Sequence, residues 1–280
     1  MKKGAKRVII ITERRYCMKH VIITGAYGGM GYAAVKSLKD KGYFVFALDK
    51  KVQEAEENVM PIEVDLTDSD AVARAYDKVR AVTEEVYAIV HFAGIYNLDS
   101  LVEMTEESFR RIYEINLFAA YRVNKTFLPL LTKGSRIVIT TSELAPLDPL
   151  PFTGIYAITK SALDKYAYSL RMEVQLLGIS VSVLRPGAVD TGMLGASTAA
   201  LDRFIENTQL YSCNAKRFKS IVEGVEARKV KADKIGEITV KILSAKRPKH
   251  VYKINRNPLL LLLNVLPPRL ATYIIKLILK

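Results

Sequence analysis

Cysteine and histidine are scarce in this chain of 280 residues. The two cysteines, Cys17 and Cys213, form neither a CxxC pair nor a disulfide framework, which favours a reducing compartment such as the cytoplasm. The three histidines, His20, His91 and His250, are isolated in the sequence and form no metal-ligand cluster. We therefore expect a cytoplasmic protein without a metal site.

Long hydrophobic runs and acidic residues near the C-terminus are also missing. No stretch of about 18 uninterrupted apolar residues occurs, so no membrane-spanning helix is expected. From Lys246 onward there are eight Lys and Arg residues and no acid, and the first 20 residues hold seven basic residues and one acid. Because the whole chain has a formal net charge of +13, the region between these ends is nearly neutral. This distribution argues against a nucleic-acid partner and favours an anionic surface near one end.

The length and globular composition fit one large α/β domain. Residues 1–17 precede the segment "KHVIITGAYGGMG", which is a complete beginning for such a domain, so we expect them to form an extension or a small extra strand. Their short apolar run fits neither a signal peptide nor a membrane anchor. We expect the domain to occupy residues 18–250 and a basic, apolar tail to occupy residues 251–280.

Short runs rich in β-branched residues alternate with longer amphipathic segments after residue 20. This alternation predicts parallel strands joined by right-handed helical crossovers, and therefore a single doubly wound α/β domain of the Rossmann type. The expected strands are 20–24, 43–49, 59–68, 86–94, 135–143 and 179–187. The expected main helices are 29–42, 69–82, 105–132 and 154–178.

The segment "TGAYGGMG" (24–31) lies between the first strand and the first helix. In this context its glycines permit a tight turn and let backbone N–H groups and the helix N-terminus approach a pyrophosphate. Asp49 follows about 20 residues later, where its carboxylate can accept hydrogen bonds from both ribose hydroxyls of NAD. It would repel the 2′-phosphate of NADP, although Lys50 and Lys51 partly offset that repulsion. We therefore expect NAD, with NADP as the alternative.

Tyr156 and Lys160 are four positions apart in an expected helix. Residues with this spacing share a helix face, so the ammonium group lies beside the phenol ring. Because an adjacent cation favours the phenolate, we expect the pKa of Tyr156 to fall from about 10 toward neutral. Such a tyrosine can donate a proton to a carbonyl oxygen or accept one from an alcohol.

Together these motifs resemble the classical branch of the short-chain dehydrogenase/reductase family. The family loop TGxxxGxG is matched by Thr24, Gly25, Gly29 and Gly31. Gly28 also fits the TGxxGxxG loop of the extended branch, but the modest length and "YAITKSAL" (156–163) favour the classical one. The catalytic tetrad that the resemblance implies consists of Asn116, Ser142, Tyr156 and Lys160. The resemblance covers about residues 20–245.

The resemblance also implies a role for each member of the tetrad. Tyr156 would act as the general acid and base, and Lys160 would also hold the nicotinamide ribose. Ser142 would hydrogen-bond the substrate oxygen, and Asn116 would support a water that links Lys160 to solvent.

Further segments resemble the cofactor-binding parts of the family. "VDLTD" (64–68) resembles the segment that packs on adenine, and "RPGAVDTGM" (185–193) resembles the turn that fixes the carboxamide. "HFAG" (91–94) departs from the usual NNAG, and we expect His91 to be a hydrogen-bonded strand-end residue. The gap from Ser142 to Tyr156 is one residue longer than the family pattern. The expected cofactor-binding residues are Gly25, Tyr27, Gly28, Gly29, Met30, Gly31, Asp49, Asp65, Leu66, Ala93, Gly94, Tyr156, Lys160, Pro186, Gly187, Val189 and Thr191.

Two segments are expected to determine which substrate is bound, and the tail forms a separate feature. Residues 144–155 are apolar and rich in proline, and residues 192–230 fit a helical lid. In the tail, a helix is expected to begin at Pro258 and to break at Pro267–Pro268, and the next helix is apolar almost all round. Three roles for the tail stay open: an anionic membrane surface, which we favour, a cover over the active site, or an oligomer interface.

These observations predict an NAD(P)-dependent oxidoreductase. It would interconvert an alcohol and a ketone or aldehyde on an apolar substrate of the steroid, retinoid or lipid type. The resemblance implies a homodimer or homotetramer formed through the helices at 105–132 and 154–178, and the tail would add peripheral membrane contact to a cytoplasmic protein. The alternatives are a non-catalytic nucleotide-binding redox sensor and a soluble 3-oxoacyl reductase.

Overall fold

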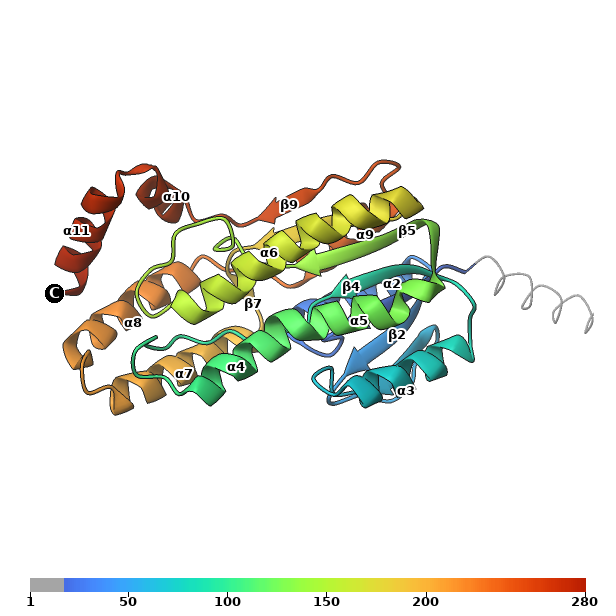
Figure 1. Cartoon of the computed structure of the whole chain (residues 1–280), viewed down its shortest axis with the longest axis horizontal. Helices are drawn as coiled ribbons and strands as arrows, with labels where there is room; N and C mark the ends of the chain where they lie inside the picture. The colour runs from blue at the N-terminus through green and yellow to red at the C-terminus, as the bar shows by residue number, and fades with distance from the viewer. Residues whose placement is uncertain (1–17) are drawn as a thin grey trace, which may run out of the picture.

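A seven-stranded parallel sheet lies at the centre of the computed structural model, which describes residues 18–280 without the side chains of residues 193–198 and 225–226 (Figure 1). The strand order is β3-β2-β1-β4-β5-β6-β9. The strands are β1 (His20–Thr24), β2 (Phe44–Asp49), β3 (Val59–Glu63), β4 (Val86–His91), β5 (Leu131–Thr140), β6 (Ser180–Pro186) and β9 (Val251–Ile254). The doubly wound α/β fold expected from the sequence is confirmed. The extension expected over residues 1–17 lies outside the described residues.

The central strands are apolar on both faces because helices cover both sides of the sheet. On β1, Ile22 packs into a cluster on one face, whereas Val21 and Ile23 pack into a second cluster on the other. All three side chains are fully buried. The near-continuous hydrophobic runs of these strands therefore reflect two cores rather than one.

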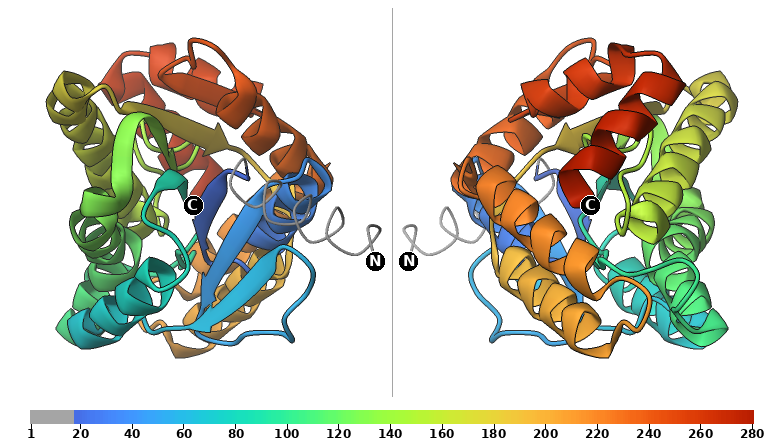
Figure 2. Two further views of the ribbon diagram at one scale, coloured as in Figure 1. Left: turned by 90° about the vertical axis from the view of Figure 1, so that its right-hand side faces the viewer. Right: turned by 90° about the vertical axis from the view of Figure 1, so that its left-hand side faces the viewer.

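Two layers of helices enclose the sheet, as the end-on views of Figure 2 show. The helices α2 (Gly29–Asp40) and α9 (Asp233–Ser244) pack against each other on one face. The other face carries α3 (Ser69–Arg80), α5 (Ala119–Phe127) and α6 (Gly154–Val174). The long helix expected at 105–132 consists of α4 (Glu106–Tyr113), a π-helical turn (Glu114–Phe118), α5 and a short 3₁₀ turn (Leu128–Leu130).

The lid and the tail lie at the end of the sheet toward which the strands point (Figure 1). The lid helices are α7 (Gly192–Asn207) and α8 (Ser212–Glu226), and the tail helices are α10 (Pro258–Val265) and α11 (Pro268–Leu279). Two short strands, β7 (Val189–Asp190) and β8 (Val230–Lys231), pair beside the lid. Leu279 of α11 is buried with Phe218 of α8 in a third cluster, and the Asn214 side chain donates a hydrogen bond of 2.7 Å to the Leu279 carbonyl. The tail is thus packed onto the lid.

One boundary expected from the sequence is wrong. Residues 251–254, assigned to the tail, form β9 and pair in parallel with β6 from Val183 to Pro186. The error arose because "VYKI" is only four residues long and contains a lysine, so its pattern is weak; the open edge of β6 makes it a strand. Helix α9, which was not assigned either, precedes it. Within the described residues, no helix is both long and apolar enough to cross a bilayer.

Candidate functional site

The candidate site lies where the strand order reverses. Strands β1 and β4 are neighbours in the sheet, although β2 and β3 come between them in the sequence and lie on the far side of β1. In doubly wound sheets, ligands bind in the crevice beyond the carboxyl ends of two such strands. The glycine loop follows β1 and the "HFAG" segment ends β4, so both meet at this crevice.

The glycine loop allows the chain to pass very close to itself. Gly25 has a φ of +65°, and a Cβ on Gly31 would lie 1.9 Å from the Gly25 carbonyl oxygen, so a side chain fits neither position. Gly29 faces Thr191, whose side chain would lie 2.6 Å from a Cβ there. These contacts bring the loop, the start of α2 and the 189–191 turn together.

The N-terminus of α2 is suited to an anion. Among the described residues no side chain caps the helix at Gly28, and its first turn holds no acid. The first N–H groups of an α-helix lack partners within the helix and carry a partial positive charge. The loop thus fits the pyrophosphate of a dinucleotide.

Asp49 ends β2 beside this loop. Its Oδ2 accepts a hydrogen bond of 2.9 Å from the Tyr27 backbone N–H, and its Oδ1 accepts one of 2.7 Å from the Lys50 backbone N–H. The Lys50 ammonium forms an ion pair of 2.7 Å with Asp65. Partial burial alone would raise the pKa of Asp65, but hydrogen bonds from Lys50 and Thr67 outweigh it and hold the pKa at about 2. Asp65 therefore stays ionised and keeps Lys50 engaged.

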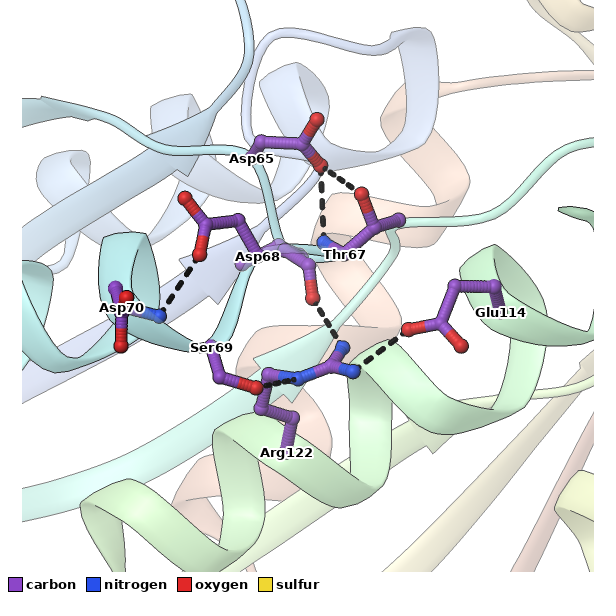
Figure 3. Close-up of polar contacts among 8 residues, drawn as sticks. Asp65, Thr67, Asp68, Ser69, Asp70, Glu114 and Arg122 are labelled. Carbon is purple, nitrogen blue, oxygen red and sulfur yellow. Dashed lines mark hydrogen bonds and ion pairs between the residues drawn. The ribbon is translucent and has the colours of Figure 1, made fainter.

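The segment expected to face adenine is held in place by Arg122, as Figure 3 shows. This α5 residue donates hydrogen bonds of 2.6 Å to the Leu66 carbonyl and 2.9 Å to the Ser69 hydroxyl, and it pairs with Glu114 at 2.6 Å. Asp68 in turn accepts a hydrogen bond of 2.8 Å from the Asp70 N–H and caps α3. Arg122 thus ties the loop after β3 to the helix layer.

Three of the four tetrad residues line one pocket. Ser142 follows β5, and Tyr156 and Lys160 lie one turn apart on α6. The expected cofactor residues that line the same pocket are Met30, Gly94, Tyr156, Lys160, Pro186, Gly187, Val189 and Thr191. The others lie outside its lining, between β1 and the first turn of α2, at the end of β2, or in the loops that follow β3 and β4: Gly25, Tyr27, Gly28, Gly29, Gly31, Asp49, Asp65, Leu66 and Ala93.

Asn116, the fourth tetrad residue, lies behind the pocket in the π-helical turn. It is buried, and its amide donates to the Ile95 carbonyl at 3.0 Å and to the Thr159 hydroxyl at 3.1 Å. Its Oδ1 accepts a hydrogen bond of 2.8 Å from the Ile95 N–H. A Cβ on Gly94 would lie 3.2 Å from this Oδ1 and 3.3 Å from Lys160 Nζ, so both polar atoms come close to the strand-end backbone. A π-turn of this kind re-aims one side chain within a helix and is frequent at functional sites.

Lys160 is buried and belongs to the pocket lining. Its Nζ donates a hydrogen bond of 3.3 Å to the Thr140 carbonyl and lies 5.7 Å from the centroid of the Tyr156 ring. Burial lowers the pKa of Lys160 to about 8, because the ammonium form loses its hydration.

We expected a lowered pKa for Tyr156, and this expectation is wrong when only the protein's own groups act on the phenol. Burial raises the pKa of Tyr156 to about 12; a hydrogen bond with Ser142 lowers it, and the Glu143 carboxylate raises it further. Helical spacing correctly placed Lys160 beside the phenol ring, but it could not reveal that both groups are desolvated. Desolvation penalises the charged form of each group and is the largest cause of both pKa shifts.

His91 has a structural partner, as the sequence suggested. Its ring nitrogen Nε2 lies 2.9 Å from Asn124 Oδ1, and burial lowers its pKa to about 4. Its neutral ring is therefore part of the core between β4 and α5.

A family model described as short chain dehydrogenase matches residues 19–202. The chain belongs to the short-chain dehydrogenase family. This confirms the resemblance drawn from the tetrad and the glycine loop, and it agrees with the doubly wound fold.

The relatives of this short-chain dehydrogenase differ in how much of their length aligns with this chain. Estradiol 17-beta-dehydrogenase 2 of Mus musculus is 32% identical over 190 residues, which cover 64% of this chain and 50% of that protein. The matched region thus spans about half the length of that relative. The 3-ketodihydrosphingosine reductase of Bacteroides thetaiotaomicron is 26% identical over 229 residues, covering 81% of this chain and 84% of that protein. The alcohol dehydrogenase of the archaeon Thermococcus sibiricus, solved in complex with 5-hydroxy-NADP, has a TM-score of 0.69 and 25% identity, covering 84% of this chain and 95% of that one.

Several pocket residues of this short-chain dehydrogenase were not expected from the sequence, and three of them stand out. Glu143 follows Ser142, Tyr96 packs edge-on against Tyr156 with ring centroids 4.5 Å apart, and Leu260 comes from α10 of the tail. The acid directly after Ser142 is a signal that could have been noticed. Leu260 and Tyr96 reach the pocket only through tertiary packing.

Proposed function

We propose that the protein is a nicotinamide-dependent oxidoreductase that interconverts an alcohol and a ketone or aldehyde on an apolar substrate. The observation that carries this proposal is that Ser142, Tyr156 and Lys160 line one pocket at the crevice beside the glycine loop. The pocket brings two hydroxyls and an ammonium group to the edge of a site that fits a dinucleotide. This is the set of groups that a carbonyl reduction or alcohol oxidation requires.

Tyr156 would move the proton in this reaction. A substrate oxygen held by the hydroxyls of Ser142 and Tyr156 would take the phenolic proton during reduction and return it during oxidation. The dinucleotide, when bound, supplies or accepts the hydride. Lys160, whose pKa burial lowers to about 8, can exchange a proton near neutral pH and would stabilise the phenolate as it forms. Asn116 would support a water that connects Lys160 to solvent.

The same residues would hold the dinucleotide. The pyrophosphate would meet the N-terminus of α2, and Asp49 would accept the ribose hydroxyls. Because the Lys50 ammonium is paired with Asp65, it is not free to offset the repulsion between Asp49 and a 2′-phosphate. This supports NAD as the preferred cofactor, with NADP as the alternative.

An apolar substrate fits the rest of the pocket. Its outer wall is built from aliphatic and aromatic side chains of the 144–155 loop, the lid and the tail, among them Leu144, Leu150, Phe218, Val222 and Leu260. Two relatives are named a dehydrogenase of estradiol and a reductase of 3-ketodihydrosphingosine. These names support a substrate of the steroid or long-chain lipid type.

We also propose that the tail contacts an anionic membrane surface. Although Leu260 and Leu279 are buried, large apolar side chains elsewhere on α10 and α11 are exposed: Leu259, Leu262, Val265, Leu270, Tyr273, Leu277 and Ile278. Four cations and no acid accompany them between Arg256 and Lys280. Exposed leucines with basic residues favour the interface of an anionic bilayer. Since the tail also lines the pocket, this contact would bring a lipid-derived substrate close to its site.

A homodimer or homotetramer is supported by the outer faces of α5 and α6. Phe118 and Tyr121 at the first and Tyr168 and Met172 on the second are all exposed by 45% or more. Exposed aromatic and methionine side chains on neighbouring helices are typical of subunit interfaces.

The substitution Tyr156→Phe tests the proposal. It removes the proton donor and keeps the ring, so kcat should fall by about 10²–10⁴-fold while affinity for NAD stays within about twofold of the wild type. Tyr168→Phe on the exposed face of α6 is the matched control and should leave kcat unchanged. A protein that binds NAD but shows no Tyr156-dependent turnover on a panel of steroid, retinoid and long-chain alcohols would instead fit a redox sensor.

A further inference from the structure

Glu143 places a carboxylate in the pocket wall next to the reacting groups. It directly follows Ser142, its side chain is part of the pocket lining, and only 7% of the residue is exposed. Its backbone N–H donates a hydrogen bond of 2.8 Å to the Pro186 carbonyl, which fixes the position of the residue. One oxygen, Oε2, accepts a hydrogen bond of 2.6 Å from the Asn257 backbone N–H at the start of α10.

The negative charge of Glu143 has no ionic partner of its own. Within the described part of the chain no salt bridge involves it. Burial raises its pKa, and the Asn257 hydrogen bond and the nearby charge of Arg256 lower it only in part. A buried carboxylate without a countercharge is costly for a protein. A neutral amide at this position could accept the same hydrogen bond from Asn257, so anchoring the tail does not explain the charge.

The charge also opposes the proposed chemistry when the pocket holds a neutral substrate. The Glu143 carboxylate raises the pKa of Tyr156, because it disfavours a second negative charge close by. A cation bound between the substrate oxygen site and Glu143 would cancel this effect and help Tyr156 release its proton. Among the described lining residues, Lys160 is the only other charged one, and its Nζ donates to the Thr140 carbonyl instead of forming an ion pair with Glu143.

We infer that Glu143 binds the ammonium group of the substrate, which is therefore an amino alcohol or amino ketone with its nitrogen close to the reacting carbon. The inference rests on the proposed function and narrows its substrate class. Ser142 and Tyr156 hold the oxygen, Glu143 holds the amine, and the apolar wall takes the hydrocarbon part. The ammonium form makes a charge-assisted hydrogen bond with Oε1, the oxygen that Asn257 leaves open.

Two matched alcohols test this assignment. One is a long-chain amino alcohol with the amine on the carbon next to the carbinol, and the other carries a methyl group in place of the amine. The full-length wild type should oxidise the amino alcohol with a kcat/KM about ten- to a hundredfold above that of the methyl analogue. In Glu143→Gln this preference should vanish, while the rate on the methyl analogue stays equal or rises. The amide keeps an acceptor for Asn257, so the tail stays anchored.

Glu103→Gln is the control, because Glu103 also accepts backbone hydrogen bonds, at 2.9 Å from Gln209 and 3.2 Å from Leu210, but does not line the pocket. It should keep the wild-type preference. Equal kcat/KM values for the two alcohols in the wild type, or a preference that survives in Glu143→Gln, would overturn the inference.

Calorimetric titration of both alcohols separates this inference from the proposed function. If the wild type turns over neither alcohol but binds the amine about tenfold more tightly, and Glu143→Gln does not, the proposed activity fails and the amine site stands. If both alcohols bind equally to the wild type, the amine site is refuted whatever the turnover. If Glu143→Gln fails to fold, the comparison of the two alcohols in the wild type is sufficient to support or refute the amine site.

Discussion

Tyr156 and Lys160 lie one turn apart on α6, and protein surrounds both side chains. Burial raises the pKa of Tyr156 to about 12 and lowers that of Lys160 to about 8, so each resists its charged form. Under the proposed function, a further positive charge in the pocket, such as the nicotinamide cation or a substrate ammonium group, would lower the pKa of Tyr156 again. At the scale of single residues, the direction of each pKa shift is therefore set by desolvation and not by the helical spacing that first identified the pair.

The lowered pKa of Lys160 predicts how its replacement changes stability with pH. Between pH 8 and about 10.5 the unfolded chain binds this proton and the folded protein does not, so the cost of burying Lys160 is fully present below pH 8 and is lost as the pH rises through this window. In cofactor-free protein, Lys160→Met should raise the free energy of unfolding at pH 7 by on the order of 3 kcal/mol. The gain should shrink toward zero at pH 10.5.

Urea unfolding at several pH values measures this gain. Lys165→Met, on an exposed part of the same helix, is the matched control and should change stability little at any pH. A Lys160→Met gain that is the same at pH 7 and pH 10 would show that the ammonium is not desolvated as the structure has it.

At the scale of elements, the loop between β1 and α2 forms the part of the crevice that we propose for the pyrophosphate. Its glycines serve different purposes. Gly31 lets the start of α2 touch the backbone of Gly25, whereas Gly28 has more room and lies at the helix N-terminus that would meet a phosphate. Arg122 on α5 holds the neighbouring segment 64–68, which is expected to face adenine, through its hydrogen bond to the Leu66 carbonyl.

The close approach at Gly31 predicts a large cost for a single methyl group. A Cβ there would lie 1.9 Å from a backbone oxygen, so α2 or the loop must move, and Gly31→Ala should destabilise the protein by about 3 kcal/mol. Gly224 in α8 is a helical glycine with no described atom within 4 Å of a Cβ. Gly224→Ala should therefore stabilise the protein by about 0.5–1 kcal/mol. Thermal unfolding of both variants checks the contrast, and similar effects of the two substitutions would contradict it.

At the scale of the whole molecule, the lid, the tail and the pocket gather at one end of the sheet (Figure 1). Among the contacts that anchor the tail are the hydrogen bond from the Asn257 N–H to Glu143, the hydrogen bond of 2.7 Å from the Asp148 N–H to the Asn264 side chain, and the packing of Leu279 in the lid cluster. Because the tail both lines the pocket and exposes leucines, the proposed membrane contact would lie close to the proposed substrate site.

Two exposed tail leucines test the proposed membrane contact. Leu262 and Leu277 are 59% and 55% exposed, so an acidic side chain there should leave the fold intact. Each of Leu262→Glu and Leu277→Glu should reduce co-sedimentation with anionic vesicles by at least about tenfold, because a leucine buried in the interface is worth about 1.5–3 kcal/mol. Leu176→Glu on the 3₁₀ turn (Gln175–Leu177) after α6, where the leucine is 84% exposed, should bind like the wild type. Equal binding by all three variants would rule out the tail as the contact.

The sequence by itself determined the fold class, the family and the three tetrad residues that line the pocket, Ser142, Tyr156 and Lys160. Strand and helix periods, the glycine loop and the spacing of Tyr156 and Lys160 are local patterns, and local backbone geometry is enough to interpret them. The segment "VYKI" marks the limit of such local patterns. Its four residues have a weak strand pattern, and they form a strand because they pair with the edge of β6.

Only the tertiary structure decided the electrostatics and the composition of the pocket wall. Whether a phenol and an amine are buried depends on every element packed around them, and so does the direction of their pKa shifts. Likewise, Glu143 and Leu260 are 117 positions apart in the sequence and meet in one pocket because α10 folds back over the carboxyl ends of the strands. Contacts of this kind arise from long-range packing, which no local pattern encodes.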